Sequence, residues 1–328
     1  MKYFLYIFIF FKDLFLSRKN FFHNSKPTTF QLMRFFCKMT DGVILTFISK
    51  FLNLKSKLPS RFKNGFSIEN PLTLNETIDL KNALLDMHIK SSANDKIKFK
   101  ENAIDFNFYN SKNIVKFNIA PEEMMKNKLV AKYATNNQWI KRCYEVLGTQ
   151  PYLVGITAWV TLPSPLSSND YDDIGKIESS QMWHRDCDYL RDIKVMTYLT
   201  NVENEEDGPF EIIKNSHCLT FFNPFKYAMG LAMRVKSEYV NKYYINKKHS
   251  FLGKSGSTFL VDTRALHRGK TINKKNHYRL TLQLYFTNSL FGNEVRHSKL
   301  KLDESWDSYK VWHDANKNTN TYKALFIK

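Results

Sequence analysis

The sequence predicts a mainly β protein, built as an antiparallel sandwich or a jelly roll. From residue 151 onward, short apolar segments alternate with polar turns and no helical pattern lies between them, which is typical of antiparallel folds. The 27 Phe and 17 Tyr supply flat rings that pack well on pleated sheet faces. The expected strands are Tyr152–Thr161, Ile193–Val202, Phe210–Lys214, Ser257–Asp262 and Tyr278–Phe286.

Helical patterns precede these strands. An approximate apolar stripe from Leu74 to Met87 predicts an amphipathic helix. Pro121 and the two acids after it begin a second pattern. Proline lacks an N–H that the first turn would leave unpaired, and the acids face the positive end of the helix dipole. This pattern runs to Leu147 and ends at Gly148, so we expect α-helices that flank the β core.

Four segments follow from these patterns. Residues 1–70 form a basic, aromatic-rich N-terminal extension, and residues 71–150 a helical flanking region. Residues 151–290 form the β core, and residues 291–328 a C-terminal extension. A disordered chain is excluded, because 43% of the residues are hydrophobic and 15% are aromatic.

The charge is strongly basic, with a formal net charge of +18 at pH 7. Residues 1–100 carry 17 Lys and Arg against 7 Asp and Glu. A basic surface attracts anions in general, although a Lys- and Asn-rich coding bias would give the same composition on a merely solvated surface. No basic and aromatic module of a nucleic-acid-binding fold is present, so we expect no nucleic-acid partner.

The N-terminus begins with an aromatic, apolar run from Tyr3 to Phe11 that Lys12 and Asp13 interrupt. The run is too short to span a bilayer. The alternative of an exported protein lacks a small-x-small cleavage site after the run. We expect a helix that lies on the domain or on a membrane surface, and a cytoplasmic protein that is at most membrane-peripheral.

The four cysteines are widely spaced, and none forms a C-x-x-C pair. This spacing favours neither a zinc ribbon nor a disulfide framework, and it fits a reducing compartment. Cys187 directly follows Asp186, which is considered below as a metal ligand, but we interpret Cys187 as a small buried apolar residue. The four are Cys37, Cys143, Cys187 and Cys218.

A His-x-Asp motif at His184 and Asp186 is the first candidate for chemistry. In a strand, residues i and i+2 point to the same face, so both side chains can converge on one ion. The motif alone is weak evidence for a metal site, because a His-x-Asp pair occurs by chance in a chain with nine histidines. His267, which follows an apolar strand, completes the two imidazoles and one carboxylate that non-haem Fe(II) prefers, with positions left open for 2-oxoglutarate and O₂. We interpret His217 and Trp183 as structural.

Arg279 is the third element, twelve residues after His267 on an alternating strand. Arg279 and Thr281 share one face of that strand with Gln283 and Tyr285. An inward arginine is costly to bury without a partner. A dicarboxylate supplies that partner, because guanidinium grips carboxylate in bidentate fashion, and Thr281 can donate a second hydrogen bond.

Across about residues 120–290, the motifs together resemble the phytanoyl-CoA dioxygenase-like family of Fe(II)/2-oxoglutarate oxygenases. The resemblance rests on the order of six short motifs. These are Gln181-Met-Trp-His184-Arg-Asp186, Lys194 with Tyr198-Leu-Thr-Asn-Val202, Gly208-Pro-Phe210, Asn215-Ser-His217, Asp262-Thr-Arg-Ala-Leu-His267-Arg-Gly269 and Arg279-Leu-Thr-Leu-Gln283. Where the family often has Pro-Gly-Ser-His, this chain has Lys214-Asn-Ser-His217, and asparagine tolerates the same left-handed turn.

The resemblance implies a double-stranded β-helix core, a cupin-like jelly roll, with flanking α-helices. It implies Fe(II) held by His184, Asp186 and His267, and 2-oxoglutarate held by Arg279 and converted to succinate and CO₂. Three further residues are expected to line the cosubstrate pocket, namely Gln181, Lys194 and Tyr198. Related halogenases have a small residue in place of the carboxylate, so Asp186 favours hydroxylation. The substrate is expected to be a small molecule or a lipid or acyl compound, and the basic surface favours an anionic one.

Two other functions stay open at this point. A cupin-type metalloenzyme that does not use 2-oxoglutarate would have no need of an inward Arg279. A catalytically silent binding protein on the same fold would have no reason to keep the three metal ligands and the arginine together.

Overall fold

The computed structural model describes residues 62–91, 96–98, 115–148, 150–164, 180–186, 192–217, 234–287 and 300–327. The N-terminal aromatic run from Tyr3 to Phe11 and the cysteines Cys37, Cys187 and Cys218 lie outside these residues. Within the described ranges, no helix combines the length and the apolar character that crossing a bilayer requires.

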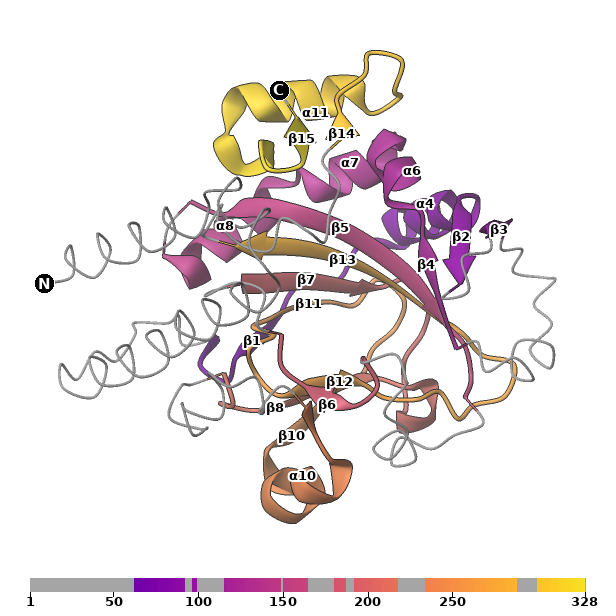
Figure 1. The fold of residues 1–328 in the computed structure, drawn as a ribbon, viewed down its shortest axis with the longest axis vertical. Coiled ribbons are helices and arrows are strands. Elements are labelled where there is room, and N and C mark those ends of the chain that lie inside the picture. Colours follow the sequence, from indigo (N-terminus) through magenta and orange to yellow (C-terminus); the bar gives the residue numbers. More distant parts are fainter. Residues whose placement is uncertain are drawn as a thin grey trace, which may run out of the picture.

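Two antiparallel sheets lie one above the other and form the body of the protein (Figure 1). The large sheet has the order β1-β11-β7-β13-β5-β4-β2-β3, and the small sheet has the order β10-β8-β12-β6-β9. The prediction of a mainly β, jelly-roll protein with flanking helices is therefore confirmed. The strands of the large sheet are β1 (Phe66–Ile68), β2 (His88–Ser91), β3 (Lys96–Lys98), β4 (Lys116–Ile119), β5 (Tyr152–Thr161), β7 (Asp192–Tyr198), β11 (Thr258–Val261) and β13 (Arg279–Thr287). Those of the small sheet are β6 (Trp183–His184), β8 (Phe210–Ile213), β9 (Arg234–Val235), β10 (Lys248–Phe251) and β12 (His267–Gly269).

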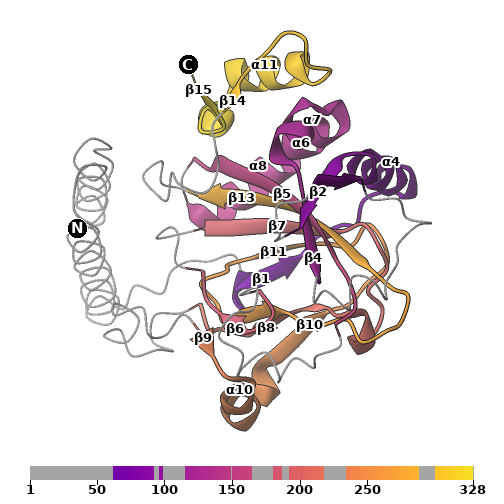
Figure 2. The same ribbon diagram turned by 45° about the vertical axis from the view of Figure 1, so that its right-hand side comes forward.

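Helices cover the outer faces of both sheets (Figures 1 and 2). Four helices lie over the large sheet, namely α4 (Leu74–Leu85), α6 (Pro121–Lys126), α7 (Lys128–Ala134) and α8 (Asn137–Leu147). Helix α10 (Ser237–Tyr244) lies beneath the small sheet. At the C-terminal end, α11 (Tyr309–Asn318) packs against α7 beside the parallel pair β14 (Leu300–Lys301) and β15 (Phe326–Ile327). The inner faces of the two sheets therefore face each other.

The helical pattern of residues 121–147 is three helices rather than one, which corrects the sequence prediction. They are α6 (Pro121–Lys126), α7 (Lys128–Ala134) and α8 (Asn137–Leu147). Asn127 and Asn136 have extended backbones, and their side chains accept hydrogen bonds from the first N–H groups of the next helix. Asparagine favours such caps because its side chain competes with the helical backbone bonds. Gly148 ends α8 in the left-handed conformation, as predicted.

The alternation along β13 divides the interior into two parts. Its leucines and Phe286 point into the main hydrophobic core, which lies between the large sheet and the helices. Arg279 and Thr281 lie on the other face, toward the small sheet. A second cluster of apolar side chains, the inter-sheet cluster, packs between the sheets. Its members are Phe66, Met196, Tyr198, Val202, Phe210, Ile212, Phe251, Phe259, Val261 and Ala265.

The five predicted strands are all present, with small shifts of their ends. The largest shift is at β7, which ends at Tyr198 instead of Val202. The predicted helix at Leu74 ends at Leu85, two residues early. The strands that the sequence did not indicate include β1, β4, β6 and β9, which have two to four residues each. Such strands are too short for alternation to be visible and are defined by their partners.

Thr73 provides a test of the local signals that position α4. Its hydroxyl accepts a hydrogen bond from Glu76 N at 3.3 Å, and Glu76 Oε2 accepts one from Thr73 N at 2.9 Å, so both halves of a capping box are present. We expect Thr73→Ala to lower the free energy of unfolding in urea by about 1 kcal/mol. Thr73→Ser keeps the hydroxyl and serves as the control. Equal stability of the alanine and serine variants would contradict the assignment.

Candidate metal centre

His184 and His267 are directly opposed on neighbouring strands of the small sheet. Strand β12 pairs with β6 in the register His267↔His184, and directly opposed residues project from the same face of a sheet. The ring centroids lie 4.3 Å apart. Asp186 follows two residues after His184 and is held in place by its own N–H, which donates to Thr263 O at 2.9 Å. Together, His184, Asp186 and His267 form the metal-ligand cluster.

Both imidazoles are oriented by backbone carbonyls. His184 Nδ1 lies 2.8 Å from Met182 O, and His267 Nδ1 lies 2.9 Å from Ala265 O. A carbonyl oxygen only accepts hydrogen bonds, so Nδ1 carries the proton in each ring and Nε2 is left as the lone-pair donor. This is the arrangement that a metal-ligating histidine requires.

The donor atoms lie at distances that suit a single ion. Asp186 Oδ1 is 3.8 Å from His184 Nε2, and Asp186 Oδ2 is 3.7 Å from His267 Nε2. Each distance is shorter than two metal–ligand bonds of about 2.1 Å placed end to end. Two neutral nitrogens and one carboxylate are a donor set for divalent iron and related metals, so the residues present fit such an ion.

Lys194, on β7 of the opposite sheet, forms an ion pair with Asp186 Oδ2. Its ammonium also lies 4.8 Å from the ring centroid of Tyr285. Tyr285 in turn donates a hydrogen bond of 2.6 Å to the buried carboxylate of Asp192. The large sheet, through Lys194, therefore neutralises the charge of the Asp186 carboxylate and holds the carboxylate in place.

The electrostatic environment keeps the three ligands in their metal-binding protonation states. Burial would raise the pKa of Asp186, but Lys194, His267 and His184 outweigh it and hold that pKa well below its usual range. Burial, together with the charge of His184, lowers the pKa of His267 to about 3. Burial also lowers the pKa of His184. At neutral pH the cluster therefore has two neutral imidazoles and one carboxylate.

Arg279 lies at the start of β13, on the inner face of the large sheet, and is 5% exposed. Its Nη2 is 3.4 Å from Thr161 Oγ1, the hydroxyl of its register partner on β5. Among the described residues, Nε and Nη1 of Arg279 and Oγ1 of Thr281 make no hydrogen bond, and no carboxylate pairs with the guanidinium. A buried guanidinium and hydroxyl of this kind fit a carboxylate-bearing ligand. Arg279, Thr281 and Thr161 are called the Arg279 site below.

The three residues predicted to line the cosubstrate pocket are Gln181, Lys194 and Tyr198, and each has a different environment. Gln181, three residues before His184, is buried, and within the described ranges its Oε1 has no hydrogen-bond donor. Lys194 contacts the carboxylate ligand, as given above. Tyr198 is the register partner of Thr281, but its hydroxyl donates to Phe251 O at 3.2 Å and accepts from Phe210 N at 2.8 Å. These backbone bonds leave Tyr198 mainly a packing role, and its contact with a cosubstrate stays a prediction.

The two side chains interpreted as structural lie away from the cluster. Trp183 is fully buried on the outer face of the small sheet with Ile213 and Val240 of α10. His217 is buried against Gly65, where an added Cβ would come within 2.6 Å of His217 Nδ1. His217 is not part of the metal-ligand cluster.

Sequence reasoning missed three contributors to this region. Thr161 contacts Arg279. Gly269 leaves room for the Arg279 side chain, since a Cβ at Gly269 would lie 3.1 Å from Arg279 Nη2. Arg234 is the register partner of His184 on β9. Alternation on the strand Tyr152–Thr161 places Thr161 on an inner face, but no sequence signal joins β9 to β6.

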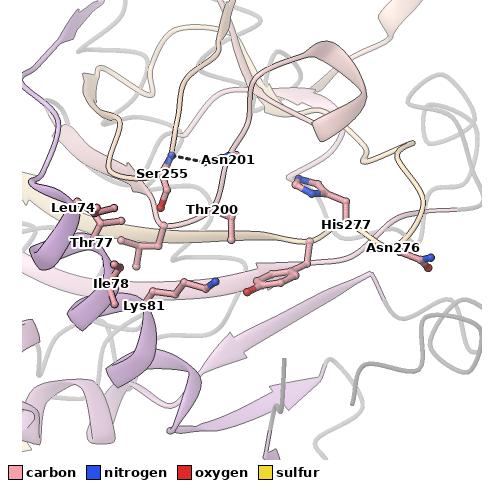
Figure 3. A pocket seen from close by; sticks show the side chains of 11 residues that line it. Leu74, Thr77, Ile78, Lys81, Thr200, Asn201, Ser255, Asn276 and His277 are labelled. Atoms are coloured by element: carbon pink, nitrogen blue, oxygen red, sulfur yellow. Dashed lines mark hydrogen bonds between the residues drawn. The ribbon is translucent and has the colours of Figure 1, made fainter. Parts of the chain in front are cut away.

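A separate cavity of about 350 Å³ lies on the helical side of the large sheet (Figure 3). Leu74, Ile78 and Lys81 of α4 form one wall, and Asn276 and His277 belong to the other. Tyr278, which also lines the cavity, packs in the main core with the buried face of α4. None of the residues that line this cavity belongs to the metal-ligand cluster or to the Arg279 site.

Comparisons with known proteins support the fold. No family model matches the sequence, and no curated protein matches it. Among solved structures, HygX from Streptomyces hygroscopicus with nickel and 2-oxoglutarate bound has a TM-score of 0.50 and 12% identity, covering 77% of this chain and 94% of HygX. The non-heme alpha ketoglutarate dependent epimerase SnoN from nogalamycin biosynthesis has a TM-score of 0.46 and 13% identity, covering 70% of this chain and 82% of SnoN. At this identity the similarity to HygX establishes a shared fold, and no more.

The ligand assignment can be tested by metal binding alone. His267→Ala removes one of three donors, and we expect the Mn(II) affinity measured by electron paramagnetic resonance to fall by more than about a hundredfold. That loss would exceed the 10–100-fold effect of removing a residue that only orients a ligand. His313→Ala, on α11, removes a histidine outside the cluster and should leave the affinity unchanged. Wild-type affinity in the His267 variant would refute the assignment.

Proposed function

We propose that this protein is a non-haem iron dioxygenase that uses 2-oxoglutarate and O₂ to hydroxylate a small molecule. The observation that carries the proposal is the buried Arg279, which pairs with no carboxylate of the described residues and lies on the sheet facing a His-Asp-His cluster. A metal site alone would suit many enzymes. A buried guanidinium without a carboxylate among the described residues supports a second ligand that brings its own carboxylate.

His184, Asp186 and His267 would hold the iron and leave coordination positions open for the cosubstrate and O₂. When bound, the iron supplies the redox chemistry that couples decarboxylation of 2-oxoglutarate, giving succinate and CO₂, to oxidation of the substrate. The chain itself orients the ligands. The carbonyls of Met182 and Ala265 fix the two imidazoles, and Lys194 fixes the carboxylate.

The Arg279 site would bind the 5-carboxylate of 2-oxoglutarate. Nε and Nη1 of Arg279, which make no hydrogen bond among the described residues, can donate two hydrogen bonds, and the Thr281 hydroxyl on the same face can donate a third. The surrounding inter-sheet cluster excludes water and strengthens these charge-assisted bonds. HygX, which shares the fold, binds nickel and 2-oxoglutarate, and this supports a metal and 2-oxoglutarate as ligands of this protein.

The resemblance to the phytanoyl-CoA dioxygenase-like family stays an interpretation of the motifs. Hydroxylation is proposed because Asp186 occupies the position where related halogenases have a small residue. The cupin-type enzyme without 2-oxoglutarate is less well supported, because it gives Arg279 and Thr281 no ligand. The substrate is proposed to be a small molecule or a lipid or acyl compound.

Cosubstrate binding tests the Arg279 site directly. We expect 2-oxoglutarate to produce a visible absorption band when titrated anaerobically into the Fe(II)-loaded protein. Arg279→Gln removes a buried charge-assisted pair, so the Kd should rise by about a hundredfold, and Thr281→Val should raise it by about fivefold. Arg142→Gln, which removes an arginine paired with Glu69 on the helical side, is the matched control. Unchanged Kd values in both site variants would support the cupin-type alternative.

Turnover provides a separate test of the carboxylate ligand. Such enzymes convert some 2-oxoglutarate without a substrate, and we expect Asp186→Ala to abolish that slow release of succinate. Succinate can be measured by mass spectrometry under air with Fe(II) and ascorbate. A variant that is folded by circular dichroism and keeps full turnover would refute the assignment of Asp186.

A further inference from the structure

The small sheet carries a row of directly opposed residues that continues past the two histidine ligands. Ile212 of β8 pairs with His267 of β12, and His267 pairs with His184 of β6. His184 in turn pairs with Arg234 of β9, which is the last strand of this sheet. Arg234 is therefore the next residue after the metal ligands in a single row across the sheet.

The direction of the Arg234 side chain follows from this register. Directly opposed residues project from the same face of a sheet, so Arg234 emerges on the inner face with His184. The neighbouring pair confirms the alternation. Trp183 and its register partner Val235 project to the outer face and pack together with Val240 of α10. Arg234 thus belongs to the face that holds the metal-ligand cluster.

Arg234 is exposed, unlike the other cations around the cluster. Its Nη1 lies 4.0 Å from Met182 Sδ, and in the part of the chain that the structure describes no carboxylate pairs with it. Asp186, the nearby acid, is engaged by Lys194.

The cosubstrate does not account for this arginine. The group proposed to bind the distal carboxylate of 2-oxoglutarate is Arg279, which belongs to the large sheet, whereas Arg234 belongs to an edge strand of the small one. With iron and 2-oxoglutarate bound, Lys194, Arg234 and Arg279 would leave the site with a net positive charge. The site therefore favours a further anion at its exposed side.

We infer that Arg234 binds an anionic group of the primary substrate, a carboxylate or a phosphate. The inference rests on the proposed function and narrows the substrate to a small anionic molecule. Because Arg234 is next to His184 in the row, an anionic group bound by Arg234 would lie on the same face of the sheet as the metal-ligand cluster. Guanidinium suits both anions, since its planar fork matches their paired oxygens.

The test uses anion binding by the full-length protein loaded with Mn(II) and saturated with 2-oxoglutarate. Inorganic phosphate is observed by the paramagnetic broadening of its ³¹P resonance, and acetate by the broadening of its methyl ¹H resonance. We expect one or both anions to be broadened with a saturable Kd. Arg234→Gln should raise that Kd about tenfold or more, and Arg234→Lys should raise it less. Lys242→Gln removes the same charge from exposed α10 and should leave it unchanged.

The outcomes distinguish a failure of the role of Arg234 from a failure of the proposed function. Broadening of phosphate alone or of acetate alone identifies which anion the site prefers, and both support the inference. Equal Kd values in the wild type and in Arg234→Gln, or no saturable broadening by either anion, overturn the role of Arg234 while leaving the proposed function intact. Failure of the wild type to bind Mn(II) or 2-oxoglutarate overturns the proposed function and the inference together.

Discussion

The metal-ligand cluster depends on one register, the pairing of β12 with β6 that sets His267 opposite His184. Because side chains alternate along a strand, a slip of one residue in either strand would turn an imidazole to the outer face, under α10. The outer face opposes such a slip. Trp183 is fully buried there, Arg268 lies 4.6 Å from its ring centroid, and Arg268 Nε is 2.5 Å from Glu211 Oε2. Packing on one face thus fixes the chemistry on the other.

The two sheets contribute different parts of the site. The small sheet supplies both histidines, and the large sheet supplies Arg279 and the lysine that pairs with Asp186. The relation between the metal position and the Arg279 site is therefore set by how the sheets pack. Among the described residues no carboxylate pairs with the buried Arg279, which is costly, and the burial of leucines and Phe286 on the opposite face of β13 offsets part of that cost.

Sequence patterns located the long strands, which have strong local signals, and the combination of a His-x-Asp pair with a histidine after an apolar strand pointed to the three candidate metal ligands. The nine-residue strand β13 alternates clearly between polar and apolar residues, and Arg279 lies at its start. His184 lies on the two-residue strand β6 and was found through its His-x-Asp spacing to Asp186. The division of residues 121–147 into three helices was missed, since an asparagine cap and an exposed helical asparagine look alike in sequence. Arg234 and Thr161 were missed because only long-range pairing brings them to His184 and Arg279. Such pairing is a property of the folded sheet and not of any short window.

The inter-sheet cluster connects these parts. Phe210 stacks on the ring of His267 with centroids 5.3 Å apart, and it also contacts Phe251 and Phe259. Phe259 belongs to β11 of the large sheet, so a continuous set of aromatic rings runs from that sheet to a metal ligand. Because protein interiors are close-packed, they transmit small displacements of one side chain to its neighbours. The rings that hold the sheets together therefore also hold His267, and a change in inter-sheet packing would alter the metal geometry even where no ligand is touched.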